Sequence, residues 1–249
     1  MMKIGIIGCG YIGSVIAENF KDEVLACYDR NMENMEKISK IVNRDINCSF
    51  EKIIKMDLDL IVESASVEAV RDLVPKVLEN GKNVLIMSVG ALADSQLLSK
   101  LKKLASGNNC KIYIPHGAIG GLDAVKTASS LGITKIVLTT RKNPEVLGIK
   151  IIKEKIVFEG HASEAVKKFP KNINVSAALS LAADKEAYVR IIADPSVDTN
   201  IHEIYVEGSF GKMNLIFNNL PSENKRTSIL AAFSAVNLIK SLKSEILIY

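Results

Sequence analysis

The stretch that decides the fold lies at the start of the chain, where residues 3–13 read KIGIIGCGYIG. A short apolar strand runs directly into Gly8-x-Gly10-x-x-Gly13, and Asp29 follows the next apolar run. In such a turn the first glycine permits the tight bend, the second lets the backbone approach a pyrophosphate, and the third lets the helix pack closely. We therefore expect a dinucleotide site whose phosphate-binding residues are Gly8, Gly10, Tyr11, Ile12 and Gly13.

The residues that follow the second apolar run bear on the choice of nucleotide. Asp29 lies ~20 residues after the first glycine, the spacing at which a carboxylate binds the ribose hydroxyls of NAD. Arg30, the next residue, could instead pair with the 2′-phosphate of NADP. We expect NAD to be preferred and NADP to be tolerated. Ala65 and Ser66, which follow a third apolar run, are expected to contact the cofactor too.

Composition limits the class of protein. The chain has 249 residues, of which 48% are hydrophobic and 24% charged, as in a soluble globule of one or two domains. The net charge of +4 is too dispersed for a nucleic-acid surface, and no apolar stretch approaches the ~20 residues of a membrane span. The four cysteines form no C-x-x-C pair, so neither a disulfide framework nor a metal site is expected. We expect a cytoplasmic protein with no membrane or nucleic-acid partner.

Apolar runs alternate with helical segments through the first half of the chain, which predicts an α/β fold. The expected strands are Ile4–Ile7, Val24–Tyr28, a short piece near Cys48, Leu58–Val62, Val84–Met87 and Ile112–Ile114. Together with their helices they predict a Rossmann domain, a doubly wound parallel sheet, over residues 1–116.

The pattern changes after the glycine-rich segment at residues 115–121. Alternating apolar residues at Ile133–Thr140, Ile201–Phe210 and Met213–Phe217 predict a second α/β domain with a mixed open sheet, over residues 117–222. The C-terminal part, 223–249, carries one amphipathic helix, Thr227–Leu242, which we expect to pack back on the first domain.

Three histidines are available for acid–base chemistry. His161 precedes a helix start, so we expect an exposed loop or cap position for it. His116 lies in the glycine-rich segment, where it could line a site or only neighbour the backbone. His202 lies after a polar loop that leads into a strand, and spacing alone does not decide whether it is catalytic.

Several segments of the chain resemble the L-aspartate dehydrogenase family of NAD biosynthesis. They are PHGAIGGLDA at 115–124, FPKNINVSA at 169–177, Asp194-Pro195 followed by His202, and NKRTS at 224–228, and they occur in order along essentially the whole chain. The resemblance implies that Ala118 and an asparagine of the NINV segment contact NAD(P). Asn174 is the first choice and Asn172 the second. His202 would be the active-site histidine.

The same resemblance implies a reaction. L-aspartate would lose hydride from Cα to give iminoaspartate, which is hydrolysed to oxaloacetate and ammonia or passed to quinolinate synthase. Plausible partners of the substrate carboxylates are Lys225, Arg226, Thr227 and Ser228, and a homodimer through the second sheet is expected. Rival interpretations are a dihydrodipicolinate- or homoserine-type reductase, or a non-catalytic NAD(H) sensor. The role of His116, where many members have serine, stays open.

Overall fold

The computed structural model describes residues 1–169, 174–222 and 227–247. These residues divide into two compact units, the first formed by Met1–Pro115 together with residues from Ala235 onward, and the second by His116–Ser234. None of the helices that the described residues form combines the length and the apolar character of a membrane-spanning segment.

The first unit is built around sheet A. Its elements are β1 (Ile4–Ile7), α1 (Tyr11–Asn19), β2 (Val24–Tyr28), α2 (Met32–Val42), α3 (Phe50–Ile53), β3 (Leu60–Glu63), α4 (Val67–Glu79), β4 (Asn83–Ile86), η1 (Val89–Ala93), α5 (Ser95–Gly107) and β5 (Ile112–Tyr113). All strand pairs are parallel, in the order β2-β1-β3-β4-β5. The strands of the centre, β1 and β3, are wholly buried, which explains why they are continuous apolar runs.

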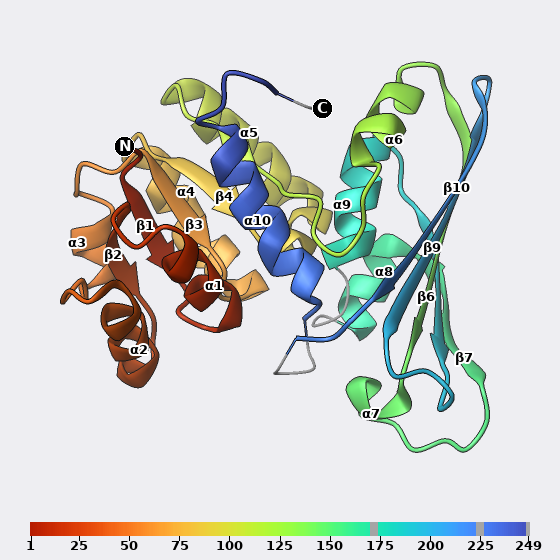
Figure 1. The fold of residues 1–249 in the computed structure, drawn as a ribbon. Coiled ribbons are helices and arrows are strands. Elements are labelled where there is room, and N and C mark those ends of the chain that lie inside the picture. The colour runs from red at the N-terminus through yellow and green to blue at the C-terminus, as the bar shows by residue number, and fades with distance from the viewer. Residues whose placement is uncertain (170–173, 223–226, 248–249) are drawn as a thin grey trace. The chain divides into compact units, whose positions relative to one another are not determined.

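The strand order of sheet A places a ligand crevice. The chain moves from β1 to β2 on one side and then crosses to β3 on the other (Figure 1). Because such crossovers are right-handed, α1 and α4 cover opposite faces, and the order reverses between β1 and β3. Ligands of open α/β sheets bind outside the carboxyl ends of the strands at this reversal. The strand expected near Cys48 is reduced to one bridge, between Asn47 and Cys27.

The second unit is built around sheet B. Its elements are α6 (Leu122–Ser129), β6 (Ile133–Lys142), α7 (Pro144–Leu147), β7 (Lys155–His161), α8 (Ala162–Lys168), α9 (Asn174–Ala183), β8 (Tyr188–Ala193), β9 (Asn200–Gly208), β10 (Gly211–Asn219) and the start of α10 (Ile229–Ser241). The strand order is β10-β9-β6-β8-β7, with β6 and β8 parallel and the other pairs antiparallel. The prediction of a parallel Rossmann sheet followed by a mixed second sheet is therefore confirmed.

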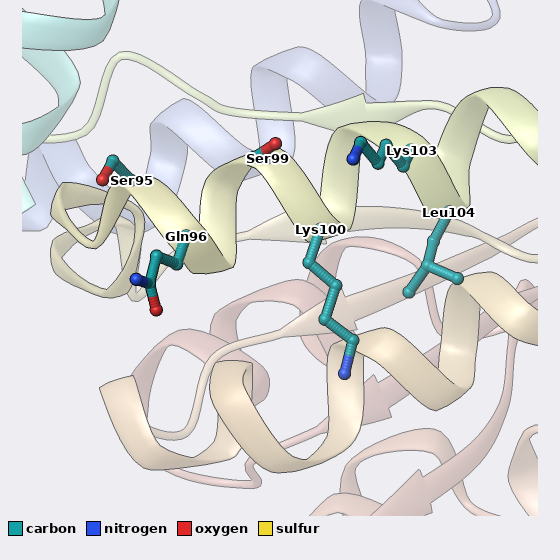
Figure 2. Close-up of a pocket in the computed structure, with 6 residues that line it drawn as sticks. All are labelled: Ser95, Gln96, Ser99, Lys100, Lys103 and Leu104. Carbon is teal, nitrogen blue, oxygen red and sulfur yellow. The ribbon is translucent and has the colours of Figure 1, made fainter.

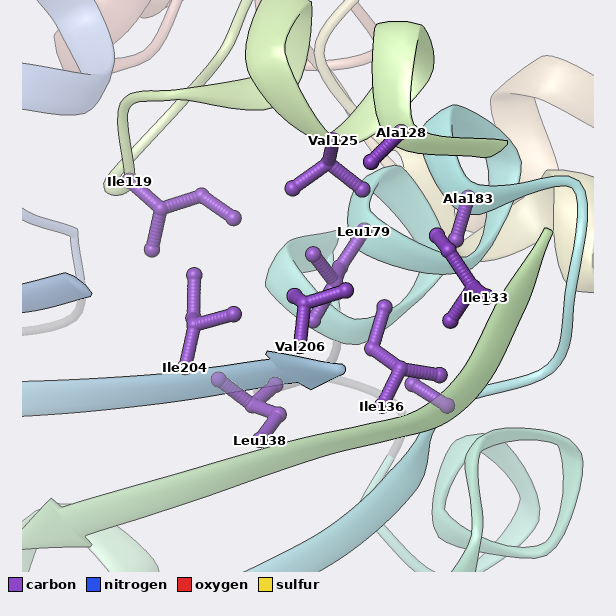
Figure 3. Close-up of a cluster of buried hydrophobic side chains, with 11 residues drawn as sticks. Ile119, Val125, Ala128, Ile133, Ile136, Leu138, Leu179, Ala183, Ile204 and Val206 are labelled. Atoms are coloured by element: carbon purple, nitrogen blue, oxygen red, sulfur yellow. The ribbon is translucent and has the colours of Figure 1, made fainter. Parts of the chain in front are cut away.

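Helices α6 and α9 cover one face of sheet B and close its core. Buried side chains from both helices and from β6 and β9 form one cluster, drawn in Figure 3: Ile119, Val125, Ala128, Ile133, Ile136, Leu138, Leu179, Ala183, Ala187, Ile204 and Val206. Ala183 lies beside Ile133, at the start of β6, whereas Leu179 lies farther along the sheet above Val206. Helix α9 therefore runs antiparallel to β6, and its N-terminus points to the end of the sheet where β6 finishes.

Residues at the C-terminal end of the chain contribute to the first unit. The chain joins this unit at Ala235, within α10. Lys243 places its ammonium 2.7 Å from a carboxylate oxygen of Glu23 and over the ring of Phe20. The helix begins at Ile229, two residues later than expected, because the hydroxyl of Ser228 caps its first turn by accepting from the Ala231 N–H.

Candidate functional site

Two glycines of the fingerprint are required by packing. Gly8 has φ +93°, and a Cβ there would lie 2.5 Å from the backbone nitrogen of Ala65. Gly13 lies in α1, where a Cβ would meet the carbonyl oxygen of Gly8 at 2.4 Å. Both distances are shorter than any real Cβ contact, so a side chain at either position would displace the turn. These glycines place α1 directly against the end of β1.

Gly10 is different, because it borders open space. A Cβ on this residue would find no heavy atom within 4 Å, and its backbone is extended, with φ −77°. Gly10 is the N-cap of α1, and no side chain caps that helix end. A helix N-terminus beside open space is suited to an anion, since its N–H groups and dipole favour negative charge. The turn thus fits the pyrophosphate of a dinucleotide, with Tyr11 and Ile12 half-buried in the first helical turn.

Asp29 is connected to the fingerprint by hydrogen bonds. One carboxylate oxygen accepts from the Cys9 N–H at 2.7 Å, and the other accepts from the Asn31 N–H at 2.8 Å. Each oxygen retains a second lone pair that a hydroxyl can use. Asp29 therefore lies where the sequence placed it, at the end of β2 beside the turn, while the side chain of Arg30 is exposed to solvent.

Glu63 is a buried acidic residue next to the loop expected to contact the cofactor, and sequence analysis assigned no separate role to its carboxylate. It ends β3 and is fully buried, and its carboxylate accepts from the N–H groups of Ala65, Ser66 and Ser88 at 2.9–3.0 Å and from the Ser88 hydroxyl at 2.8 Å. Burial raises the pKa of Glu63, and the four hydrogen bonds oppose that shift. This carboxylate fixes the loops after β3 and β4 against each other.

The loop that Glu63 holds also contacts the fingerprint. The Ser64 hydroxyl donates to the carbonyl of Gly8 at 2.7 Å. Ser66 is the N-cap of α4, with its hydroxyl accepting from the Ala69 N–H, and Ala65 is exposed beside the Gly8 turn. Of the expected cofactor residues in the first unit, the structure therefore brings Gly8, Ala65 and Ser66 together.

A groove elsewhere in the first unit lies on one helix. Its lining residues all belong to α5, as Figure 2 shows: Ser95, Gln96, Ser99, Lys100, Lys103 and Leu104. Apart from half-buried Leu104 they are exposed. The groove has no fingerprint residue in its lining, so we do not assign it to the nucleotide.

The inner face of sheet B changes from apolar to polar at one end. Thr140 on β6 is opposite His202 on β9, and His202 is opposite Phe217 on β10. Two residues further along β6, the same face presents Lys142, beside Ala193 of β8. The side chains of Thr140, Lys142 and His202 are each at most 6% exposed. A polar cluster therefore continues the hydrophobic core.

His202 is held by one hydrogen bond among the described residues. Its Nδ1 lies 3.0 Å from the Thr140 hydroxyl, and the ring is only 3% exposed. Burial and, second, the positive charge of Lys142 lower the pKa of His202 to about 3. The imidazole is therefore neutral near physiological pH and can accept a proton.

Lys142 was also missed by sequence analysis. Burial lowers the pKa of its ammonium to about 8, so this lysine changes charge in a range where an exposed lysine stays protonated. The polar end of sheet B therefore holds a neutral imidazole and an amine whose pKa is lowered. Displaced pKa values are typical of functional sites.

The glycine-rich segment that contains Ala118 packs against β10. A Cβ on Gly120 would lie 3.3 Å from the ring of Phe217, and one on Gly121, where φ is +71°, would lie 2.8 Å from Leu215. The carbonyl of Ala118 accepts from the buried Asn219 amide at 2.8 Å. Ala118 is therefore fixed near the polar end of the sheet, because Asn219 is opposite Asn200 and two residues from Phe217.

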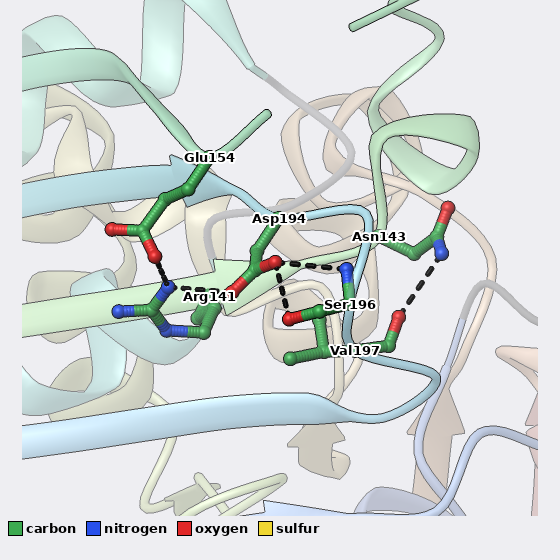
Figure 4. A network of polar contacts seen from close by, with 6 residues as sticks. All are labelled: Arg141, Asn143, Glu154, Asp194, Ser196 and Val197. Atoms are coloured by element: carbon green, nitrogen blue, oxygen red, sulfur yellow. Dashed lines mark hydrogen bonds and ion pairs between the residues drawn. The ribbon is translucent and has the colours of Figure 1, made fainter. Parts of the chain in front are cut away.

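A network of polar contacts fixes the loop that leads to His202. Arg141 pairs with Asp194 at 2.7 Å and with Glu154, and Asn143 donates to the carbonyl of Val197 at 3.0 Å (Figure 4). The hydroxyl and N–H of Ser196, and then Arg141, hold the pKa of Asp194 below its usual range. Asp194 remains ionised, and its bonds set the path of the chain between β8 and β9.

Other expected residues lie nearby or outside the described chain. Asn174 begins α9, whose N-terminus points to the polar end of sheet B, and Asn172 is outside the described residues. Lys225 and Arg226 are outside them too. Thr227 is half-buried, and its carbonyl accepts from the Ser222 N–H, while buried Ser228 uses its hydroxyl as the helix cap.

The remaining histidines do not join this cluster. His161 is exposed and is the N-cap of α8, as expected. The Nδ1 of His116 lies 2.7 Å from the carbonyl of Ile119, within the glycine-rich segment. Within residues 1–169, 174–222 and 227–247, no group of three or more His, Cys, Asp or Glu residues is arranged to hold a metal ion.

Comparisons with known proteins cover both units. Residues 8–115 match the family model described as the NAD-binding domain of homoserine dehydrogenase, and residues 123–242 match the model of the C-terminal part of aspartate dehydrogenase. The second match includes β6, β9 and the polar end of sheet B.

Whole-length relatives agree with these models. The L-aspartate dehydrogenase of Methanothermobacter thermautotrophicus is 47% identical, over 99% of this chain and 98% of its own length. That of Methanococcus maripaludis is 49% identical with the same coverage. The crystal structure of aspartate dehydrogenase from Thermotoga maritima matches with a TM-score of 0.83 and 28% identity, over 100% of both chains.

Proposed function

The chain belongs to the L-aspartate dehydrogenase family, and we propose from this that it oxidises L-aspartate with a pyridine nucleotide to iminoaspartate, which then gives oxaloacetate and ammonia. The observation that carries the proposal is the identity of nearly one half to L-aspartate dehydrogenases over almost the whole of each chain. The buried pair of Thr140 and His202 lies within the part that matches the aspartate dehydrogenase model.

Different residues are proposed to bind the cofactor and to transfer protons. A bound nicotinamide supplies the hydride acceptor for Cα of the substrate. The fingerprint turn would hold the pyrophosphate against Gly10 and the α1 N-terminus. Neutral His202 can accept a proton from water as the water oxygen bonds to the imine carbon, and can return it when ammonia leaves. Thr140 fixes the ring for that exchange.

We propose that NAD is preferred and NADP accepted. Asp29 lies beside the turn and keeps lone pairs for the ribose hydroxyls of NAD, whereas a 2′-phosphate would meet its charge. Arg30 is exposed and can reach toward such a phosphate, which supports tolerance of NADP. Ala118 and Asn174, or Asn172 in its place, are proposed as further cofactor contacts.

The substrate carboxylates are proposed to bind to residues 225–228, which precede α10 in the sequence. Lys225 and Arg226 would supply charge, and Thr227 would supply a hydroxyl. Because the Ser228 hydroxyl already caps α10, this residue would act through its remaining lone pair or by orienting the segment.

The cellular setting is proposed as follows. The product would feed NAD biosynthesis through hand-over to quinolinate synthase, and the four free cysteines suit a reducing compartment such as the cytoplasm. A homodimer is proposed through the outer face of sheet B, where Ile216 is 71% exposed and Tyr188 is 38% exposed.

The direct test follows reduced nicotinamide by absorbance with L-aspartate and either NAD or NADP. D-aspartate, L-glutamate and L-homoserine serve as controls. Turnover with L-aspartate alone is expected, and His202→Ala should lower kcat by about 10²–10⁴ while leaving NADH affinity unchanged. NADH binding without turnover of L-aspartate would contradict the proposal and favour a sensor, and turnover of L-homoserine instead would favour the rival reductase.

A further inference from the structure

Lys142 is a buried lysine on the inner face of sheet B. Lys142 is the last residue of β6 and is only 6% exposed. Ile136, Leu138 and Thr140 precede it on the same face of the strand, and the first two belong to the hydrophobic core. The lysine thus extends the inner face of sheet B instead of the outer face, where a charged side chain would be hydrated.

Cross-strand register places this lysine next to the active-site histidine. Arg141 is opposite Ile201, so the next step along the inner face brings Lys142 beside Asn200, which is opposite Asn219. The neighbouring row holds Thr140 and His202. The two rows together form one continuous polar patch across β6, β9 and β10, and every polar side chain in it is buried.

The charges that face this patch are few among the described residues. His202 is neutral, and Asn200, Asn219 and Thr140 carry no charge. Asp194, whose N–H donates to the Lys142 carbonyl, uses its carboxylate on Arg141 and Ser196, and Glu154 pairs with the same arginine. Burial lowers the pKa of Lys142. An amine in this setting can be neutral at mildly alkaline pH and then accept a proton.

We propose that Lys142 is a catalytic base that deprotonates the α-ammonium group of the substrate before oxidation, an inference that rests on the aspartate oxidation proposed above. An ammonium nitrogen has no free electron pair, so it must lose a proton before the bond to Cα can become a double bond. In this step one substrate N–H bond breaks, its electron pair stays on the substrate nitrogen, and the proton bonds to Nζ of Lys142. The proton passes to solvent after the products leave.

The alternative is that the charged lysine anchors a substrate carboxylate, and the two roles differ in the sign of their pH dependence. A base must be neutral, so kcat/KM rises as the pH passes through about 8. An anchor must be charged, so kcat/KM falls over the same range. The roles also differ for succinate, which has the two carboxylates of aspartate but no amine.

The experiment compares the full-length protein with Lys142→Met, Lys142→Ala and Lys142→Arg. Lys135→Met is the matched control, because Lys135 lies on the same strand but is exposed. The measurements are pH profiles of kcat/KM for L-aspartate, succinate affinity by calorimetry, and thermal melting to verify folding. Added methylamine tests whether a free amine restores Lys142→Ala.

The expected result has three parts. Lys142→Met and Lys142→Arg lose about 10²–10⁴ in kcat/KM, and the rise near pH 8 disappears. Succinate affinity stays close to that of the wild type, and methylamine restores part of the activity of Lys142→Ala. The Lys135→Met variant keeps the wild-type profile.

Other results overturn the inference. An activity that falls through pH 8, together with succinate binding weakened tenfold or more in Lys142→Met, assigns the lysine as a carboxylate anchor. If Lys142→Met does not fold, the arginine and alanine variants and the wild-type profile decide the matter. Wild-type turnover with unchanged variant profiles refutes the role of Lys142 alone, whereas a wild type that is inactive with L-aspartate refutes the proposed function.

Discussion

Replacement of Gly10 by alanine separates cofactor binding from folding. The backbone of Gly10 is extended, a conformation open to alanine, and the added methyl group would meet no atom of the protein within 4 Å. Alanine is a poorer N-cap than glycine by about 0.5–1 kcal/mol, but it also reduces the entropy of the unfolded chain by about 0.4–1 kcal/mol. These contributions offset each other, so we expect the melting temperature to change by at most about 4 °C.

Nucleotide affinity should respond much more strongly. The methyl group would occupy the open space beside the α1 N-terminus, where the pyrophosphate is proposed to approach the backbone. A hydrogen bond to a charged group contributes about 1.5–3 kcal/mol. Loss of one such bond would raise the Kd for NADH by about 10- to 150-fold.

The assay is NADH binding followed by fluorescence, with a melting curve for each variant. Gly13→Ala is the matched control, because its methyl group would lie 2.4 Å from the Gly8 carbonyl. Although alanine normally favours a helix by about 0.5–1 kcal/mol over glycine, this clash should lower the melting temperature. Wild-type NADH affinity in a normally folded Gly10→Ala variant would refute the placement of the pyrophosphate.

Three further predictions concern both units. Asp29→Ala should weaken NAD binding more than NADP binding, measured as the ratio of their Kd values; an unchanged ratio would contradict the role given to the carboxylate. Thr140→Val should lower kcat about tenfold by removing the hydrogen bond to His202, whereas Thr139→Val on the other face should not, and equal rates in both would exclude a positioning role. The folded protein resists protonation of His202 between about pH 6.5 and 3, while the unfolded chain does not. The free energy of unfolding should therefore decrease as the pH is lowered through this window, by on the order of 3 kcal/mol at about pH 4 relative to His202→Asn. Denaturant titrations at each pH measure this difference, and parallel curves for the two proteins would argue against a neutral, buried ring.

Much of the first unit could be predicted because its strands are short and parallel, and the central strands β1 and β3 are buried on both faces. Such strands are continuous apolar runs, and glycines and caps mark the turns between them. The strands of the second unit were harder to predict from the sequence. The alternation of apolar residues predicted β6, β9 and β10 but not β7 or β8. The strand β7 is an edge strand whose alternation is interrupted at Ile156–Phe158, and β8 follows a helix of small apolar residues.

The candidate site could be predicted where it depends on local sequence pattern, and the residues whose setting depends on burial were not predicted. The fingerprint glycines and Asp29 are set by spacing along the chain. Glu63 ends an apolar strand, and only the loops folded over it show that its carboxylate is enclosed. Lys142 did leave a signal, since it continues the alternation of Ile136, Leu138 and Thr140, but a lysine next to Arg141 and Asn143 is more typical of an exposed strand end.

In the proposed mechanism the hydrophobic core of the second unit takes part in the chemistry. Burial away from water lowers the pKa of both His202 and Lys142, and the positive charge of the lysine lowers the pKa of the histidine further. Water is excluded by the apolar row next to them on the inner face, which includes Leu138 and Ile204. At neutral pH the lysine therefore carries a proton and the imidazole does not. The packing of apolar side chains thus sets which of the two groups holds the proton.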